Sequence, residues 1–275
     1  MSTLAEKERA LYSRLAELDR VLVAFSGGVD SSLVLKASRD VLGDRARAII
    51  ARSPSLPARE LRDAFRIADE LGVHLDVIET SEHLKDDYAK NAPNRCYHCK
   101  SELFDTTRFW AASLGVTSIV DGVNADDLSD YRPGLLAGRE RGVIHPLADA
   151  GITKAEVREL SRKLGLSTWQ KPQLACLASR IPYGTRVTVD RLSKIEAVEE
   201  VLREIGCFDV RARLVSGNDD LVRIEVGESD LVRVVGQRST VLARARAVGF
   251  KRITLDLDGF RSGSMNADLV ELRRS

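Results

Sequence analysis

Apolar positions in the first two thirds of the chain follow two alternating spacings. Short apolar runs, typical of buried strands, alternate with stretches in which apolar residues recur at helical spacing. This alternation predicts an α/β fold, with a parallel sheet covered by helices. Thr153 and Glu156 have the spacing of a capping box, which marks the start of the last helix. The expected strands are 21–25, 46–51, 74–78 and 117–121, and the expected helices are 31–42, 57–71, 100–113 and 153–164.

The pattern changes after residue 166. Residues 167–190 have no clear period and contain Pro172, Pro182 and Gly184, so a long loop joining two domains is expected. The chain that follows predicts a small α+β unit, with helices at 191–205 and 230–247 and strands at 209–215, 221–226 and 250–257. We therefore expect a first domain over 1–170, an interdomain loop over 171–190, a substrate or oligomerisation domain over 191–260, and a tail over 261–275 that is a candidate for disorder.

Charge and composition reduce the number of protein classes to which the chain can belong. The formal net charge is +1, and neither 1–185 nor 186–275 carries the basic excess of a dedicated nucleic-acid binder. No apolar run approaches membrane length, and residues 1–20 form a charged amphipathic pattern rather than a signal peptide. We expect a cytoplasmic protein, in which the four cysteines serve as reactive thiols or metal ligands rather than disulfides.

The segment 26–32, Ser-Gly-Gly-Val-Asp-Ser-Ser, lies between an expected strand and an expected helix. Glycine lets backbone N–H groups approach a phosphate, the serines add donors, and a helix N-terminus adds positive potential. The spacing is neither that of a Walker A loop nor that of a dinucleotide-binding turn. Asp30 would repel phosphates unless a cation lay between them, so it is a candidate Mg²⁺ ligand. The alternatives are an ordinary capped turn and, for Asp30, a turn-forming side chain.

Ligands of parallel sheets bind at the carboxyl ends of the strands, so the loops after Phe25, Ala51 and Asp121 are expected to meet at one site. The third of these loops, 122–134, is rich in aspartate and contains Arg132. Its position favours a substrate-facing and metal-facing loop, although acidic loops are often simply solvated.

The cysteines are unevenly distributed. Cys96 and Cys99 have a C-x-x-C spacing, which suits a metal, a cluster or a redox pair, and no second C-x-x-C completes a zinc site. Cys176 lies in the expected interdomain loop, four residues before Arg180, and a nearby cation favours the thiolate. A buried structural Cys176 is equally compatible with its apolar neighbours. Cys207 is interpreted as a small core residue.

Two arginines alternate along an expected strand. Arg211 and Arg213 would lie on the same face, where two guanidinium groups repel each other unless they share an anion such as a phosphate or carboxylate. A solvated edge strand is the alternative.

Five segments together carry a family resemblance. The heptapeptide at 26–32 resembles the PP-loop of the ATP pyrophosphatases, which cleave ATP to AMP and pyrophosphate. Together the five resemble the LarE family of ATP-dependent sulfur transferases, and the similarity runs from about residue 10 to about residue 260. The segments are SGGVDSS (26–32), ARSPSLPARE (51–60), NRCYHCK (94–100), DGVNADDLSDYRPG (121–134) and KPQLACLASRIPYG (171–184).

The resemblance implies an enzyme of nickel-pincer cofactor synthesis. Such enzymes use ATP and Mg²⁺ to adenylate pyridinium-3,5-biscarboxylic acid mononucleotide and convert its carboxylates to thiocarboxylates. In one branch the residue matching Cys176 gives up its sulfur and becomes dehydroalanine. In the other, three cysteines, here Cys96, Cys99 and Cys176, hold a [4Fe–4S] cluster that carries the donor sulfide.

The residue patterns and the resemblance together predict catalytic, phosphate-binding and ATP-binding residues. Catalysis is expected from Cys176, Asp30, Ser179 and Arg180, and the substrate phosphate is expected at Arg211 and Arg213. ATP is expected at Ser26, Gly27, Gly28, Val29, Asp30, Ser31, Ser32, Ala51, Arg52, Gly122, Asn124, Asp127 and Arg132.

Two other functions stay open. The first is tRNA thiolation by a PP-loop enzyme, which the balanced charge disfavours. The second is a non-enzymatic adenine-nucleotide sensor, which would have no use for Cys176 or the arginine pair. The partners expected are a small mononucleotide and further copies of the chain, without nucleic acid or membrane.

Overall fold

A computed structural model describes residues 2–129, 133–172 and 175–261. The chain divides into two compact units. The first contains residues 1–82 and 94–174, and the second contains residues 83–93 and 175–275. The tail expected at 261–275 lies outside the described residues, apart from Arg261. In the described part of the chain, no helix is both long and apolar enough to cross a membrane.

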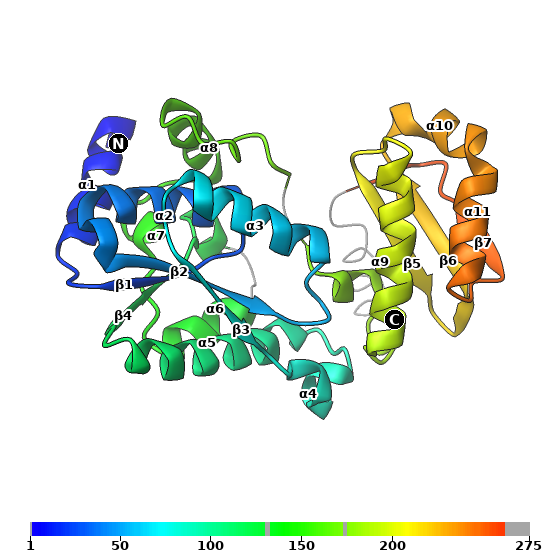
Figure 1. The fold of residues 1–275 in the computed structure, drawn as a ribbon, viewed down its shortest axis with the longest axis horizontal. Helices are drawn as coiled ribbons and strands as arrows, with labels where there is room; N and C mark the ends of the chain where they lie inside the picture. The colour runs from blue at the N-terminus through cyan, green and yellow to red at the C-terminus, as the bar shows by residue number, and fades with distance from the viewer. Residues whose placement is uncertain (1, 130–132, 173–174, 262–275) are drawn as a thin grey trace. The chain divides into compact units, whose positions relative to one another are not determined.

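The first unit is built on a parallel sheet of four strands in the order β3-β2-β1-β4 (Figure 1). Val21 of the central strand β1 pairs with Ala46 on one side and with Ser118 on the other. The structure confirms the predicted fold class and the four predicted strands, with ends shifted by one or two residues. The strands are β1 (Val21–Ala24), β2 (Ala46–Arg52), β3 (Leu75–Glu79) and β4 (Ser118–Val120).

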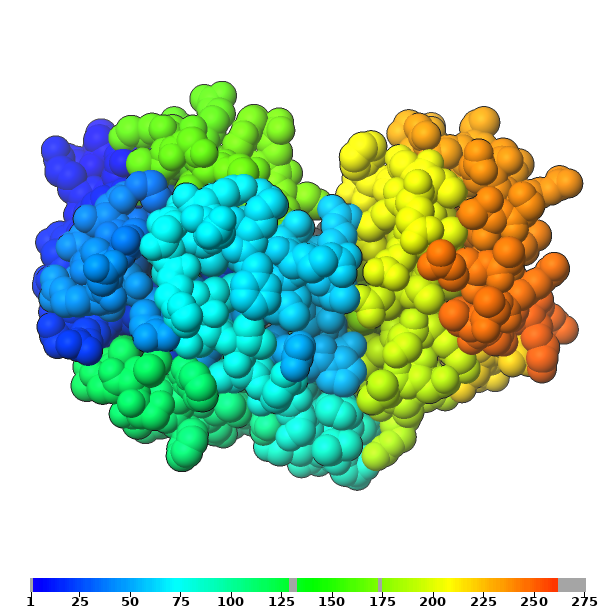
Figure 2. All heavy atoms as spheres, in the orientation of Figure 1, coloured from blue at the N-terminus to red at the C-terminus, as the bar shows by residue number. Residues whose placement is uncertain are grey.

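Helices cover both faces of this sheet because successive strand residues point in opposite directions. Val21 and Val23 face a core shared with α1, α2, α3 and α8, whereas Leu22 faces a second core shared with α5 (Figure 1). The outward face of α3 is charged and lies on the surface of the first unit seen in Figure 2. The helices are α1 (Leu4–Ala16), α2 (Val29–Leu42), α3 (Ala58–Glu70), α5 (Arg95–Ser113), α6 (Pro133–Glu140), α7 (Pro146–Asp149) and α8 (Lys154–Lys163).

The second unit packs helices on a three-stranded mixed sheet in the order β5-β6-β7. Strands β5 and β6 are antiparallel, and β6 and β7 are parallel. The segment 83–93 also belongs to this unit, since the buried Asn91 donates hydrogen bonds to the carbonyl oxygens of Ile181, Pro182 and Thr185. The elements are α4 (Asp86–Ala89), α9 (Val189–Glu204), β5 (Val210–Val215), β6 (Asn218–Val226), α10 (Leu231–Gly236), α11 (Arg238–Ala247) and β7 (Arg252–Leu255).

Four predicted elements differ from the structure by more than two residues. Strand β6 begins at Asn218, three residues before its expected start. Helix α5 begins at Arg95, five residues before its expected start, so the C-x-x-C motif is helical. The helix expected over 230–247 is two helices, because α10 ends at Gly236, a poor helix former. The strand expected over 250–257 is limited to Arg252–Leu255, and Leu257 and Asp258 form a turn after it.

Candidate active site

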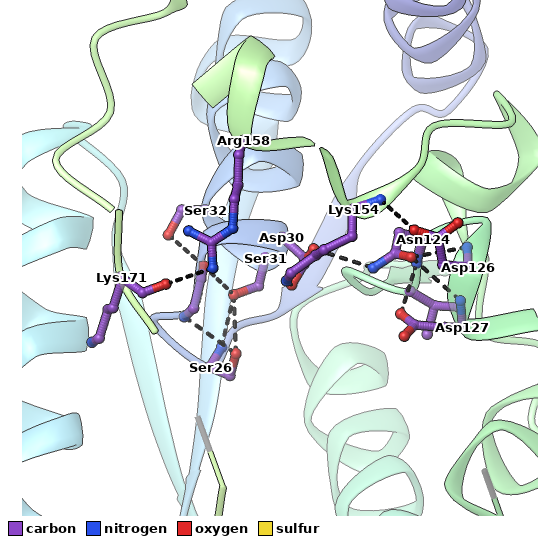
Figure 3. Close-up of polar contacts among 12 residues, drawn as sticks. Ser26, Asp30, Ser31, Ser32, Asn124, Asp126, Asp127, Lys154, Arg158 and Lys171 are labelled. Atoms are coloured by element: carbon purple, nitrogen blue, oxygen red, sulfur yellow. Dashed lines mark hydrogen bonds and ion pairs between the residues drawn. The ribbon is translucent and has the colours of Figure 1, made fainter. Parts of the chain in front are cut away.

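The loop between β1 and α2 is closed by its own hydroxyl groups. The side chains of Ser31 and Ser32 donate to the carbonyl oxygen of Gly28 at 3.2 and 2.8 Å, and the N–H of Ser26 donates to Ser31 Oγ at 3.3 Å (Figure 3). Gly27 has φ +69°, a conformation that favours glycine. At the helix start, Gly28 provides no side-chain cap, so the amino end of α2 offers N–H groups and positive potential to an anion.

Asp30, in the first turn of α2, accepts contacts from two distant segments. Lys154 forms an ion pair with one carboxylate oxygen, and Asn124 Nδ2 donates to the other at 3.3 Å (Figure 3). Lys154 is the first residue of α8, where the predicted capping box of Thr153 and Glu156 is present. The structure therefore joins Asp30 and Asn124, as expected from the sequence, and adds Lys154, which was not predicted.

The loop after β4 lies directly against the Ser26–Ser32 loop. A Cβ atom on Gly122 would approach the backbone nitrogen of Ser31 to 2.6 Å, so this position requires glycine. Asn124 and Asp127 are buried and hold the loop together, since the N–H of Asn124 donates to Asp127 Oδ2 at 3.1 Å. At these positions the loop is therefore not simply a solvated one. Arg132 lies outside the described residues.

The third expected loop has a weaker connection to the site. Arg52, at the end of β2, forms an ion pair with Glu79, and both side chains are exposed. Ala51 and Arg52 lie on the strand next to β1, at the end of the sheet that leads into Ser26. Among the contacts of the described residues, no side-chain hydrogen bond joins them to the Ser26–Ser32 loop, so their part in ATP binding stays a prediction.

Two further cations border the site. Arg158 and Lys154 are four residues apart and therefore share a face of α8. Arg158 donates to the carbonyl oxygens of Trp169 and Lys171 at 2.7 and 3.0 Å (Figure 3). Lys171 pairs with Glu60 and Asp63 of α3 at 2.9 and 3.0 Å. Neither Arg158 nor Lys171 was among the site residues predicted from the sequence. For Arg158 a signal was available, because it lies four residues after Lys154 in the helix that the capping box at Thr153 predicts.

The cysteines have three different environments. Cys96 and Cys99 lie in the first turn of α5, where a three-residue spacing puts both on one face, Cys96 exposed and Cys99 half-buried. Cys176 belongs to the second unit and is exposed, which disfavours a purely structural role. Cys207 is buried, and burial raises the pKa of its thiol, as suits a core residue. Within the described ranges, no three His, Cys, Asp or Glu side chains are gathered in a metal-binding arrangement.

Two buried arginines hold the backbone next to Cys176. Arg180 pairs with the buried Glu199 at 2.8 Å and donates to the carbonyl oxygens of residues 175 and 176 at 3.0 and 3.1 Å. Arg213 pairs with Glu225 at 2.8 Å and donates to the carbonyl oxygen of Ser179 at 3.2 Å. The hydroxyl of Ser179 in turn donates to the carbonyl oxygen of Cys176 at 2.7 Å. The carboxylate of Glu199 therefore compensates the charge of Arg180, and Arg180 in turn fixes the backbone of residues 175 and 176.

Arg211 differs from both of these arginines. Its guanidinium lies 4.6 Å from the ring centre of Phe260 and donates to the carbonyl oxygen of Val210. No carboxylate in the described part of the chain forms an ion pair with it. Burial, together with the charge of Arg180, lowers its pKa to about 10. β5 is an edge strand, but Arg211 is half-buried on it and Arg213 is buried, so the alternative of a solvated edge does not describe them.

Comparison with known proteins agrees with this geometry. The NAD synthase family model matches residues 8–103. The chain is 44% identical to an uncharacterised protein of Synechocystis, across 98% of this chain and 100% of that one. It is 39% identical to the pyridinium-3,5-bisthiocarboxylic acid mononucleotide synthase of Lactiplantibacillus plantarum, across 98% of both chains. It is 28% identical to the tRNA-specific 2-thiouridylase MnmA of Mycolicibacterium smegmatis, across 56% of this chain and 52% of that one.

The fold has a parallel sheet and a glycine-rich loop that ends in the buried Ser31 and Ser32. Together with these similarities, it defines an ATP-using enzyme of the PP-loop class. Within that class the full-length similarity to the Lactiplantibacillus synthase is decisive. The chain belongs to the LarE family.

Proposed function

We propose that the protein adenylates the carboxylates of pyridinium-3,5-biscarboxylic acid mononucleotide with ATP and converts them to thiocarboxylates. The observation that carries this proposal is the 39% identity to the named synthase over 98% of both chains. The exposed Cys176 supports it, because its backbone is fixed by two buried arginines while its thiol is accessible.

The first step requires ATP on the Ser26–Ser32 loop. The substrate carboxylate attacks the α-phosphate, pyrophosphate leaves, and an acyl-adenylate forms. Backbone N–H groups at the start of α2 suit the phosphates, and Lys154 and Arg158 supply positive charge from α8. Gly122, Asn124 and Asp127 form the wall beside the loop, and we assign the adenine to the backbone near Ala51 and Arg52.

Asp30 suits a Mg²⁺ ion, because a carboxylate is a hard oxygen ligand and lies next to the phosphate loop. Its oxygens are engaged by Lys154 and Asn124, so binding of the metal would release Lys154 towards the phosphates. The ion would neutralise charge that develops as pyrophosphate leaves.

The second step is sulfur transfer. In one form the thiolate of Cys176 attacks the acyl carbon, and AMP leaves with the electron pair of the broken bond. Loss of the Cα proton and cleavage of the Cβ–S bond then release the thiocarboxylate and leave dehydroalanine at 176. Arg180, Ser179 and Arg213 would keep the cysteine backbone in place, since each makes a hydrogen bond within residues 175–179 or to them.

Cys96 and Cys99 support a second form of this step. Two cysteines on one helical turn suit a pair of iron ligands, and a purely sacrificial mechanism does not require them. We propose that Cys96, Cys99 and Cys176 hold a [4Fe–4S] cluster, which when bound would supply sulfide from an open iron.

The phosphate of the mononucleotide is assigned to Arg211 and Arg213. Arg211 is the stronger candidate, because its charge has no carboxylate partner among the described residues, whereas Arg213 is paired with Glu225. We further propose that the protein is a cytoplasmic homo-oligomer that acts without nucleic acid. Exposed apolar side chains on the second unit, Phe208 and Val232, support the oligomer.

The experiment that tests the function supplies ATP, Mg²⁺ and the mononucleotide, and it measures pyrophosphate and the mass of the product. Thiocarboxylate product with AMP and pyrophosphate is the expected result. tRNA thiolation is the second candidate, because the chain is similar to MnmA over about half its length. Pyrophosphate release that requires tRNA would contradict our proposal. A bound nucleotide without turnover would indicate a sensor.

A further inference from the structure

A buried histidine–aspartate pair lies behind the nucleotide loop of the first unit. His145 Nδ1 and Asp121 Oδ1 are 2.7 Å apart, and the two residues are only 9% and 8% exposed. The backbone brings them together, because Val120 and Ile144 form an isolated parallel bridge beside β4. The N–H of Asp121 donates to the carbonyl oxygen of Ile144 at 3.1 Å, which places the two side chains next to each other.

Asp121 is connected to the wall of the site through its neighbours. The same oxygen that contacts His145 accepts the N–H of Val123 at 3.1 Å. The carboxylate of Asp121, the residue before Gly122, therefore also holds the backbone of the residue after Gly122. Gly122 in turn lies against Ser31, where even a Cβ atom would come within 2.6 Å of the backbone nitrogen. A change in the direction of the Asp121 carboxylate would therefore move the backbone that faces Ser31.

His145 has one polar partner. Its Nε2 is buried and has no hydrogen-bond partner within the described ranges, so the polar contact of the ring is with Asp121 alone. Ala148, one turn further along α7, donates its N–H to the carbonyl oxygen of Val123 at 3.2 Å. The segment that starts at His145 thus holds the 121–123 turn at its side chain and at its backbone.

Charged neighbours favour the histidine–aspartate contact. Burial lowers the pKa of His145, but the hydrogen bond and charge of Asp121, together with the charge of Asp149, outweigh burial and the repulsion of Arg139 and raise it. Gly138 of α6 lies close to the ring, since a Cβ atom built on it would be 3.5 Å from His145 Cε1.

We propose that His145 is a positioning residue for ATP. By holding the Asp121 carboxylate, it fixes the Gly122–Val123 backbone against Ser31, where the phosphates of ATP bind. The inference rests on the assignment of ATP to the Ser26–Ser32 loop, and it is independent of which carboxylate is adenylated and of the sulfur donor.

Two conservative variants test the geometry. In His145→Asn the amide nitrogen can replace Nδ1, whereas in His145→Gln the longer side chain puts it where Nε2 lies, away from Asp121. Loss of one hydrogen bond to a charged group corresponds to about tenfold in affinity. We expect the Kd for Mg·ATP, measured by calorimetry, to rise about tenfold in the glutamine variant and to stay near the wild-type value in the asparagine variant.

Thr107→Val is the matched control, because it removes another buried side-chain hydrogen bond, to the carbonyl oxygen of Leu103 in α5, away from the loop. It should lower the melting temperature and leave the Kd for Mg·ATP unchanged. In pyrophosphate assays the glutamine variant should raise the KM for ATP more than it lowers kcat. Equal Kd values for the glutamine and asparagine variants would overturn the proposal, and so would equal losses in the control. Wild-type protein that binds no Mg·ATP would overturn the ATP assignment as well, which separates the two failures.

Discussion

The charged side chains of the two units are used in different ways. In the first unit, cations at the edge of the Ser26–Ser32 loop are held by neighbouring groups: Lys154 by the carboxylate of Asp30, and Arg158 by carbonyl oxygens. In the second unit Arg180 is buried against Glu199, and Arg211 lies close by without a carboxylate partner in the described part of the chain.

This difference indicates which charges serve ligands and which serve the fold. A buried arginine paired with a buried glutamate is costly to break and holds a backbone in place. Burial deprives Arg211 of water, and it forms no ion pair with a carboxylate among the described residues, so it gains most from an arriving anion. We therefore infer that ATP handling belongs to the first unit, and that Cys176 and the substrate phosphate belong to the second.

We expect the largest effect from a change at Cys176, which tests the division of roles between the two units. Cys176→Ala should reduce thiocarboxylate formation to background, because both forms of the sulfur step require this thiol. Binding of Mg·ATP to the first unit should be unchanged. Cys207→Ala is the control, since its thiol is buried, and it should still form product. Product formation by Cys176→Ala, followed by mass spectrometry, would remove this residue from the chemistry.

The same experiment separates the two sulfur donors. Sacrificial transfer lowers the mass of the wild-type protein by about 34 Da, because loss of H₂S converts the cysteine residue to dehydroalanine. Cluster-based transfer after anaerobic iron reconstitution leaves the mass unchanged and gives several products per chain. Stoichiometric dehydroalanine, with Cys96→Ser and Cys99→Ser still active, would rule out the cluster.

The next effect concerns the first unit alone. Asp30→Ala should lower pyrophosphate release at least about a hundredfold, because a bound divalent cation contributes several kcal/mol to charge stabilisation. The unit should stay folded, since Asp30 is only half-buried and lies on a helix surface. Asp40→Ala, at the other end of α2, is the control. Unchanged release in Asp30→Ala would mean that the residue has no part in the mechanism.

Much of the first unit could be predicted because its signals are local. The strands are short apolar runs, and the Ser26–Ser32 loop is recognisable from spacing. The start of α5 could not be found in this way, because the apolar period that identifies the helix begins near Leu103, after the two cysteines. The helix instead begins directly after its N-cap residue Asn94, which makes no side-chain cap hydrogen bond.

Contacts between distant residues limited the prediction of the site. The capping box placed Thr153 correctly, but Lys154 reaches Asp30 across 124 positions in the sequence, which no local pattern indicates. Arg180 was expected beside the Cys176 thiol as a cation, whereas the structure pairs its charge with Glu199, 19 residues further on. The inclusion of 83–93 in the second unit likewise depends on long-range hydrogen bonds of Asn91.

A smaller effect sharpens the contrast between the arginines of the second unit. Arg211→Ala should weaken substrate binding about ten- to a hundredfold, since a charge-assisted hydrogen bond contributes about 1.5–3 kcal/mol. Its stability and its affinity for ATP should hardly change. Arg180→Met should leave substrate binding nearly unchanged and cost about 3 kcal/mol of unfolding free energy. Among the described residues, the buried Glu199 would keep Arg203 as its ion-pair partner, together with the N–H of Ala212.

Calorimetric titration with the mononucleotide and chemical denaturation test these two variants together. Equal weakening of ATP and mononucleotide in Arg211→Ala would show that this arginine is structural or serves ATP. A stable Arg180→Met would contradict the role of the buried pair.

The smallest effect is a pH dependence of opposite sign in the two units. The pKa of His145 is raised in the folded protein, so its contribution to stability is complete below about pH 6.5 and is lost as the pH rises through the raised value. The pKa of Glu199 is lowered, because Arg180 and Arg203 outweigh burial. Its contribution is therefore complete above about pH 4.5 and is lost as the pH falls through the lowered value.

Hydrogen exchange measured across pH should show α7 and the 121–123 turn opening first on the alkaline side. The α9–β5 region should open first on the acid side. His145→Asn should remove the alkaline change, on the order of 1 kcal/mol for one hydrogen bond, and leave the acid change intact. If both regions lost protection on the same side of neutrality, the assignment of these two pairs as the pH-sensitive contacts would be wrong.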